Sequence, residues 1–198
     1  ALGGSINGGE TNIAIGNYSL DANTSGDLNI GLGYVSLTQN STGSSNVGIG
    51  NSAMQLNQTG SSNTTLGNNS MKSSLSSSYN TAVGAEALFD ANRTADTDGY
   101  NTALGYNAGN TGTNDITTGN KNTLLGASTA ASAAAGTNQT VIGFGASGTA
   151  DNSVTIGNSS VTAWYPGSDD TADLGSNSVE FKDLYIDGTA NLDAVDID

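Results

Sequence analysis

Two groups of carboxylates are the residues whose spacing could support chemistry. Asp96 and Asp98 are separated by one residue, as in some calcium loops, but the oxygen-rich spacing of an EF-hand is missing. Asp169, Asp170 and Asp173 could hold a cation or form a glycosidase pair, yet no pattern fixes two of them across a cleft. The chain has no Cys or His, which excludes the usual zinc sites and the Ser-His and Cys-His catalytic pairs. We therefore predict a protein that is not an enzyme, with no catalytic residue, metal site or cofactor.

The composition narrows the structural class. Among 198 residues there are 28 Gly but only three Phe and one Trp, so a core of large side chains is not expected. Charged residues make up 11 %, which favours either disorder or a repeat stabilised by backbone ladders. The net charge of −14 repels phosphate groups and excludes nucleic acid as a partner. No apolar run reaches the roughly 18 residues of a membrane helix, so membrane insertion is not expected.

A short motif recurs along most of the chain. Its first copies are Asn12-Ile-Ala-Ile-Gly16 and, 17 residues later, Asn29-Ile-Gly-Leu-Gly33. Nine copies follow one another at intervals of 17, 21 or 14 residues, ending at Ser153-Val-Thr-Ile-Gly157. Such a period is typical of stacked coils. We predict an all-β fold, a parallel β-roll or β-solenoid of about nine short coils over residues 1–163. A small, acidic β module is expected at residues 164–198, where carboxylates are concentrated.

Three columns of the motif carry structural predictions. The leading asparagine is expected to form a hydrogen-bonded ladder between coils. These residues are Asn12, Asn29, Asn46, Asn63, Asn80, Asn101 and Asn122. The closing glycine is expected to take a backbone conformation that a Cβ would oppose. The glycines are Gly16, Gly33, Gly50, Gly67, Gly84, Gly105, Gly126, Gly143 and Gly157. The fourth position is always aliphatic and is predicted to be buried. This column is Ile15, Leu32, Ile49, Leu66, Val83, Leu104, Leu125, Ile142 and Ile156.

The remaining positions give less uniform signals. The third motif position is mostly small, so we expect that face to approach another backbone closely. Pairs such as Ser19-Leu20 follow each glycine and predict a second extended piece in every coil. The second position changes from aliphatic to threonine in five copies. These threonines are Thr64, Thr81, Thr102, Thr123 and Thr140. They could present an ice-binding surface, but a buried or interface column that bonds between coils is the more economical interpretation. Tyrosines could stack on sugars, and Trp164 and Tyr165 are expected to cap the roll.

The repeat resembles that of two kinds of fibrous protein. The pattern Asn-x-x-Ile/Leu-Gly-x-x-Ser/Ala-Leu/Met is similar to the head repeat of trimeric autotransporter adhesins (the YadA-like head) and to repeats in bacteriophage tail fibres. The resemblance implies a left-handed parallel β-roll that assembles as a homotrimer. The 14-residue spacing of the adhesins occurs only in the last unit, which favours the phage version. Ser168-Asp-Asp-Thr-Ala-Asp-Leu-Gly175 and the segment 179–190 also resemble a segment of phage fibre and virion proteins.

Together these features predict a structural segment of a virion appendage, such as a tail fibre, that supports attachment to a host cell. Its expected location is extracellular, on the virion. The expected partners are two further copies of the chain, other virion or fibre proteins, and a host glycan or protein receptor, contacted directly or through a distal tip. Two alternatives stay open: the head of a bacterial trimeric autotransporter adhesin at the cell surface, and a soluble ice-binding or polysaccharide-active solenoid.

Overall fold

A computed structural model describes residues 9–92, 98–165, 167, 174, 176, 178–183 and 185–187. The chain divides into two units, Ala1–Val161 and Thr162–Asp198, two residues from the boundary expected from the charge. Among the described residues of the second unit, Ser176 and Val179 form an antiparallel bridge. Most of its described side chains are exposed. The small β module therefore stays a prediction.

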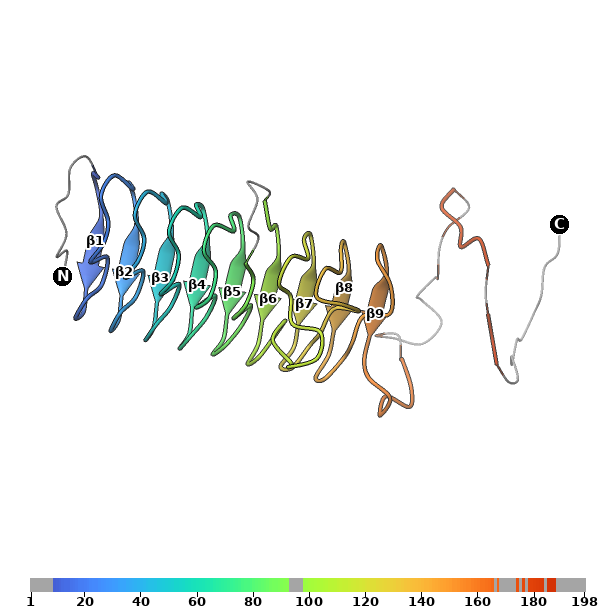
Figure 1. The fold of residues 1–198 in the computed structure, drawn as a ribbon. Helices are drawn as coiled ribbons and strands as arrows, with labels where there is room; N and C mark the ends of the chain where they lie inside the picture. Colours follow the sequence, from blue (N-terminus) through green and yellow to red (C-terminus); the bar gives the residue numbers. More distant parts are fainter. Residues whose placement is uncertain are drawn as a thin grey trace. The chain divides into compact units, whose positions relative to one another are not determined.

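The first unit is a β-solenoid (Figure 1). Each of its nine described strands has three residues and coincides with the second to fourth positions of one motif copy. The strands are β1 (Ile13–Ile15), β2 (Ile30–Leu32), β3 (Val47–Ile49), β4 (Thr64–Leu66), β5 (Thr81–Val83), β6 (Thr102–Leu104), β7 (Thr123–Leu125), β8 (Thr140–Ile142) and β9 (Val154–Ile156). They form one parallel sheet in the order β1 to β9. The prediction of an all-β parallel solenoid is confirmed.

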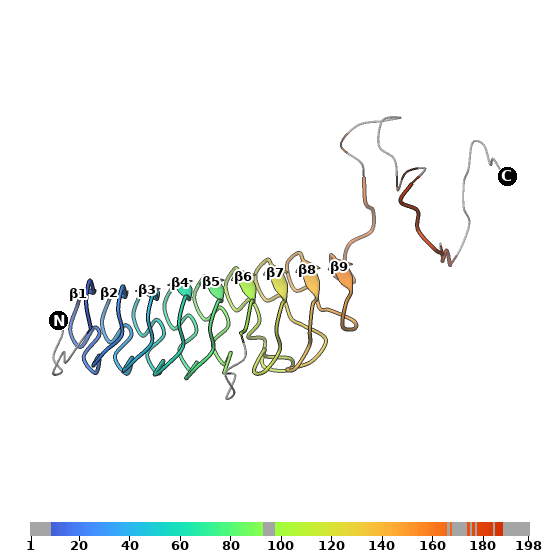
Figure 2. The same ribbon diagram turned by 90° about the horizontal axis from the view of Figure 1, so that it is seen from above.

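The register aligns equivalent motif positions. Ile13 pairs with Ile30, and the 21-residue unit between β5 and β6 keeps the same alignment, with Thr81 opposite Thr102. The extra residues therefore lie outside the sheet, in loops. Figure 2 shows the strands along one side of the solenoid and the turns along the other.

The closing glycines form the corner after each strand. Their φ angles are positive, for example 142° at Gly33 and 134° at Gly50, in a region that residues with a Cβ rarely enter. A Cβ on Gly33 would overlap the carbonyl oxygen of Gly50 in the next coil. The positive φ angles confirm the predicted conformation of these glycines, and from Gly16 to Gly126 a side chain would also overlap the backbone of the next coil.

The segment after each corner is not extended, contrary to the prediction. Leu20, Leu37 and Met54 have φ angles of 51°, 51° and 50°, in the left-handed region. Hydrogen bonds between coils hold this conformation: the amide of Leu37 donates to the carbonyl of Ala53 at 3.0 Å, and that of Met54 donates to Ser70 at 2.9 Å. The backbone ladder thus continues around the coil without a second strand.

The core consists of one large side chain per coil, supplied by these left-handed residues. In the coils from β1 to β5 these side chains share one core cluster, and all are fully buried. They are Leu20, Leu37, Met54, Met71 and Leu88. The middle residue of each strand points toward this column. A Cβ on Gly31 would overlap Ser19 Oγ and meet Leu20 Cγ at 3.3 Å, which explains the glycine at the third position of this motif copy.

The aliphatic column was assigned to the wrong face. Ile15, Leu66 and Ile156 are 59 %, 48 % and 47 % exposed, and no last residue of the nine strands is buried in the single chain. The prediction of a buried column is therefore wrong for the isolated chain. The residues that are not buried in the single chain, contrary to the prediction, are Ile15, Leu32, Ile49, Leu66, Val83, Leu104, Leu125, Ile142 and Ile156. The physical reason is that the left-handed leucines and methionines already fill the interior of a thin coil.

The core changes its pattern in the later coils. Gly109 occupies the position of Leu88 one coil later, and the middle residue of β7 is then Leu124 rather than a small residue. A Cβ on Gly109 would lie 3.0 Å from Leu124 Cδ1 and 2.9 Å from Leu88 Cδ2. Ile116, from the inserted loop, is also buried beside this position. Core volume lost from the turn is therefore restored from the strand and the loop.

Candidate functional site

Buried asparagines form a continuous ladder along the solenoid, as predicted. Asn46 Nδ2 donates to Asn29 Oδ1 at 3.1 Å and to the carbonyl of Gly60 at 2.8 Å. The amide N–H of Asn63 donates to Asn46 Oδ1 at 3.1 Å. The same pattern links successive residues as far as Asn122. Each side chain thus joins one coil to its neighbours on both sides and stiffens the stack.

The ladder ends at Gln139. Its backbone N–H donates to Asn122 Oδ1 at 3.0 Å, as an asparagine would. Its longer side chain leaves the column, because Nε2 donates to Ser132 Oγ at 2.7 Å and to Asp151 Oδ1 at 3.1 Å. The substitution of Gln for Asn in the eighth motif copy therefore marks a change in coil shape.

A second ladder of buried asparagines was missed by the sequence analysis. Asn40 Nδ2 donates to Asn23 Oδ1 at 3.0 Å, and Asn57 Nδ2 donates to Asn40 Oδ1 at 2.7 Å. The signal was available, since each is followed three residues later by glycine in the pattern Asn-x-x-Gly. In the next coil the asparagine is replaced by Ser74. Among the described residues, Asn57 Oδ1 and Ser74 Oγ are then buried without a hydrogen-bond partner.

The most extended surface feature is the outer sheet face, which we define as the first and last residues of β1 to β9. Its eighteen side chains comprise thirteen of Ile, Leu or Val and five of Thr, so the face carries no charge. In the single chain all eighteen are exposed or partly exposed. Because scattered single apolar residues are normal but long contiguous patches are not, this face is the candidate interaction surface.

The five threonines on this face, from Thr64 to Thr140, are in register through β4 to β8. None of their hydroxyls makes a hydrogen bond to the described part of the chain. The prediction that they bond between coils is therefore wrong within one chain. By contrast, the inward-facing Thr65 donates to the carbonyl of Val47 at 3.1 Å. The outer hydroxyls are left available to a partner or to water.

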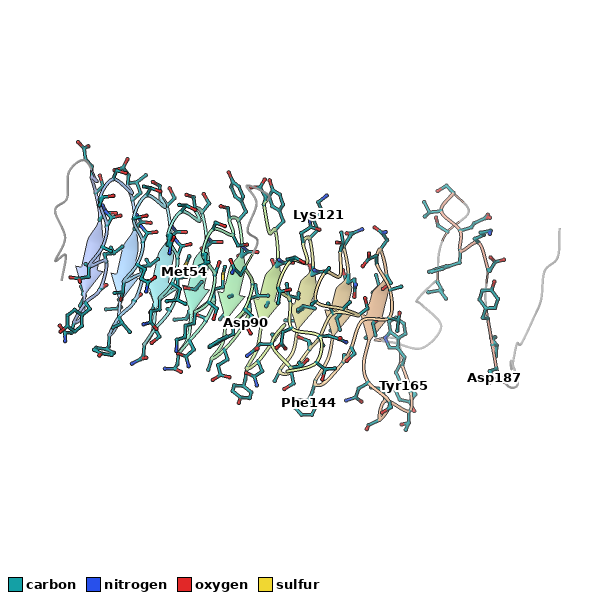
Figure 3. The ribbon with its side chains drawn as sticks, viewed as in Figure 1. Met54, Asp90, Lys121, Phe144, Tyr165 and Asp187 are labelled. Atoms are coloured by element: carbon teal, nitrogen blue, oxygen red, sulfur yellow. The ribbon has the colours of Figure 1, made fainter. Side chains whose placement is uncertain are left out.

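Aromatic side chains line the two edges beside the outer sheet face. Tyr79 and Tyr100 precede β5 and β6 and stack with ring centroids 5.2 Å apart. The Tyr100 hydroxyl donates to Asp98 Oδ2 at 2.7 Å, and this hydrogen bond raises the pKa of Tyr100 because it stabilises the neutral phenol. Lys121 continues this edge, while Phe144 projects from the opposite edge (Figure 3).

Two other predictions concern aromatic and acidic residues. Trp164 and Tyr165 belong to the second unit and are 77 % and 83 % exposed, so their capping of the roll stays a prediction. Asp96 lies outside the described residues. So do Asp169, Asp170 and Asp173.

The described residues contain no group of three His, Cys, Asp or Glu side chains placed to share a metal ion. Within the same ranges, no helix has the length and hydropathy needed to cross a bilayer. What the geometry offers is a stiff polar ladder inside and an uncharged, repetitive sheet face outside.

Comparisons with protein-family models, curated proteins and solved structures found no match for the chain.

Proposed function

We propose that this chain is a structural segment of an extracellular fibre, a virion appendage such as a bacteriophage tail fibre, in which three copies associate through their outer sheet faces. The observation that carries the proposal is the face itself, which runs without a charge along all nine strands. A surface of this length and composition is unfavourable in water and is stabilised by burial against a partner.

A second copy of the chain is the partner that fits this face best. Parallel strands repeat at about 4.8 Å, so only a partner with the same repeat matches the face coil for coil. Another copy of the chain has this same strand spacing. The chain has a net charge of −14, but none of that charge lies on the face, so copies meet there without direct charge repulsion.

The free energy gained by burying the face is comparable with the cost of association. Burying the exposed half of an Ile or Leu side chain contributes about 1 kcal/mol. For thirteen aliphatic side chains this amounts to on the order of 10 kcal/mol per copy. Each association event costs roughly 4–15 kcal/mol in lost freedom, so the face can offset that cost only if most of it is covered. Closed rotational symmetry around one axis achieves this coverage, and the number three follows from the resemblance of the repeat.

A trimeric rod with such stiff coils suits a spacer that holds a receptor-binding tip away from a particle. The asparagine ladder from Asn12 to Asn122 links consecutive coils, and the glycine corners let them stack closely. Both features resist bending along the rod. Other fibre proteins at the two ends, and a host glycan or protein receptor, are the partners that this role requires.

A second candidate is the head of a bacterial trimeric autotransporter adhesin, where the roll itself contacts the host. The exposed aromatic pairs favour it. Tyr18 and Tyr34 meet edge to face at 6.3 Å, and Tyr79 and Tyr100 stack. These pairs lie beside the outer sheet face, not on it, so trimer formation need not cover them. Binding of the purified roll to host matrix proteins, abolished by Tyr79→Ala, would favour this candidate over a spacer.

The test of self-association is a charge placed on the face. Leu66→Asp and Leu104→Asp put carboxylates at the ends of β4 and β6, on a surface that the proposal buries. We expect loss of the trimer by size-exclusion chromatography with light scattering, with the solenoid retained in the circular dichroism spectrum. The matched control is Asn51→Asp, at an exposed corner outside the face, which should leave the trimer intact. A trimer that survives both leucine substitutions would contradict the proposal.

A further inference from the structure

The outer sheet face has two columns of residues: one is aliphatic throughout, and the other contains both aliphatic residues and threonines. The last residues of the strands are aliphatic in all nine coils. The first residues are Ile13, Ile30 and Val47 in β1 to β3, threonine in β4 to β8, and Val154 in β9. The face thus carries a block of five hydroxyls, displaced from the middle of the solenoid toward β9.

These hydroxyls have different partners in different alignments of two copies. Within the described chain they make no hydrogen bond, so an interface that buries them must satisfy them. If two copies lie parallel and in register, Thr64 meets Thr64 and every other threonine meets its equivalent. Each hydroxyl can then donate to one neighbour and accept from another.

Other alignments leave hydroxyls without a partner. A slip of one coil, about 4.8 Å, places Thr64 against Val47 and Thr140 against Val154. An antiparallel alignment pairs threonine with threonine in β4 to β6 alone, because the block is off centre. The uniform aliphatic column accepts any of these alignments, so it cannot distinguish between them.

We propose that the threonine block fixes the register of the copies: it aligns them parallel and coil for coil, and it rejects slipped and antiparallel assemblies. The proposal rests on the self-association proposed above. It assigns to Thr64, Thr81, Thr102, Thr123 and Thr140 a role in partner specificity rather than in binding strength. A polar residue in an otherwise apolar interface commonly has such a role.

The experiment moves one hydroxyl from β6 to β3, so that no alignment with the parent chain pairs all five threonines. The variant Val47→Thr/Thr102→Val keeps the number of threonines and changes shape little, because Val and Thr are nearly isosteric. It should assemble with itself as the parent chain does, because every hydroxyl meets its equivalent when the copies are in register. Co-expressed with a differently tagged parent chain and analysed by native mass spectrometry, it should give mixed trimers at least about tenfold below binomial proportions, because each mismatch leaves a buried hydroxyl unpaired.

The matched control is Ile30→Val/Val47→Ile, which rearranges the same column without moving a hydroxyl. This variant should mix with the parent chain in binomial proportions. Binomial mixing of the Val47→Thr/Thr102→Val variant with the parent chain would overturn the register proposal and leave self-association standing. A monomeric parent chain would overturn the proposed function, and the register proposal with it.

Discussion

Replacing Asn63 by aspartate tests how much the buried ladder contributes to stability. Asn63 is fully buried, and its Nδ2 donates to Asn46 Oδ1 at 3.1 Å and to the carbonyl of Ser77 at 2.8 Å. In Asn63→Asp an oxygen replaces that nitrogen, so both contacts become contacts between acceptors. The bonds that Asn80 donates to Oδ1 are unaffected in geometry. The change is therefore confined to one atom and its charge.

The expected loss of stability is large for one atom. Two lost hydrogen bonds cost about 1 kcal/mol each, and the orphaned Ser77 carbonyl adds about 1–3 kcal/mol. A buried carboxylate adds several kcal/mol unless it takes up a proton. We expect a total of about 4 kcal/mol or more at neutral pH, a substantial part of the stability of an ordinary domain.

The loss should depend on pH with a defined sign. Burial raises the pKa of the new carboxyl above its ordinary value of about 4. Between that value and the raised pKa the folded state binds more protons than the unfolded state, so stability falls as pH rises. Below about pH 4 both states are protonated and the O–H can donate to one of the two acceptors. The destabilisation should therefore be smallest in acid and grow toward neutral pH.

The assay is urea unfolding followed by circular dichroism, at one chain concentration and at several pH values. The control is Asn51→Asp, an exposed position where Asn51 Oδ1 accepts a hydrogen bond from Ser52 Oγ and a carboxylate can do the same. It should change stability by less than about 0.5 kcal/mol. Equal losses in the two variants, or a loss at Asn63 that does not vary with pH, would refute the reasoning.

Two further predictions concern packing between coils. Ser74→Asn/Ser77→Gly should extend the second ladder to Asn57 Oδ1 and be about 1–2 kcal/mol more stable than Ser74→Asn alone, as measured by thermal unfolding. The glycine is needed because a Cβ at the equivalent position of the preceding coil would overlap the asparagine oxygen. Leu124→Ala should cost about 2–5 kcal/mol, and adding Gly109→Leu should restore part of it. Independent, additive effects in a double-mutant cycle would contradict this core exchange.

The motif alone located the nine strands that the structure describes. A period near 17 residues with an invariant aliphatic position predicts nine short parallel strands, and the leading asparagine predicts the ladder. Period two also shows that the second and fourth positions share a face. It does not show which face is inside, because both alternating sets are uncharged.

The interior was set by a residue that the strand pattern does not contain. Leu20 fills the coil from a left-handed backbone conformation that leucine seldom adopts, and Ser19 and Leu20 together leave no room for a Cβ at Gly31. Sequence propensity predicts an extended conformation there, and an extended leucine would point elsewhere. Hydrogen bonds between coils, such as that from Leu37 to Ala53, and the burial of the side chain stabilise the left-handed form.

The central claim is that the outer sheet face is an interface between copies of this chain. Its most direct test is the mass of the purified chain in solution, measured by light scattering across a range of concentrations. We predict a particle of three chains, each of 19.6 kDa, that persists on dilution into the low micromolar range. A folded monomer at all concentrations, with the solenoid signal intact, would contradict the account, because the face would then be stable in water without a partner.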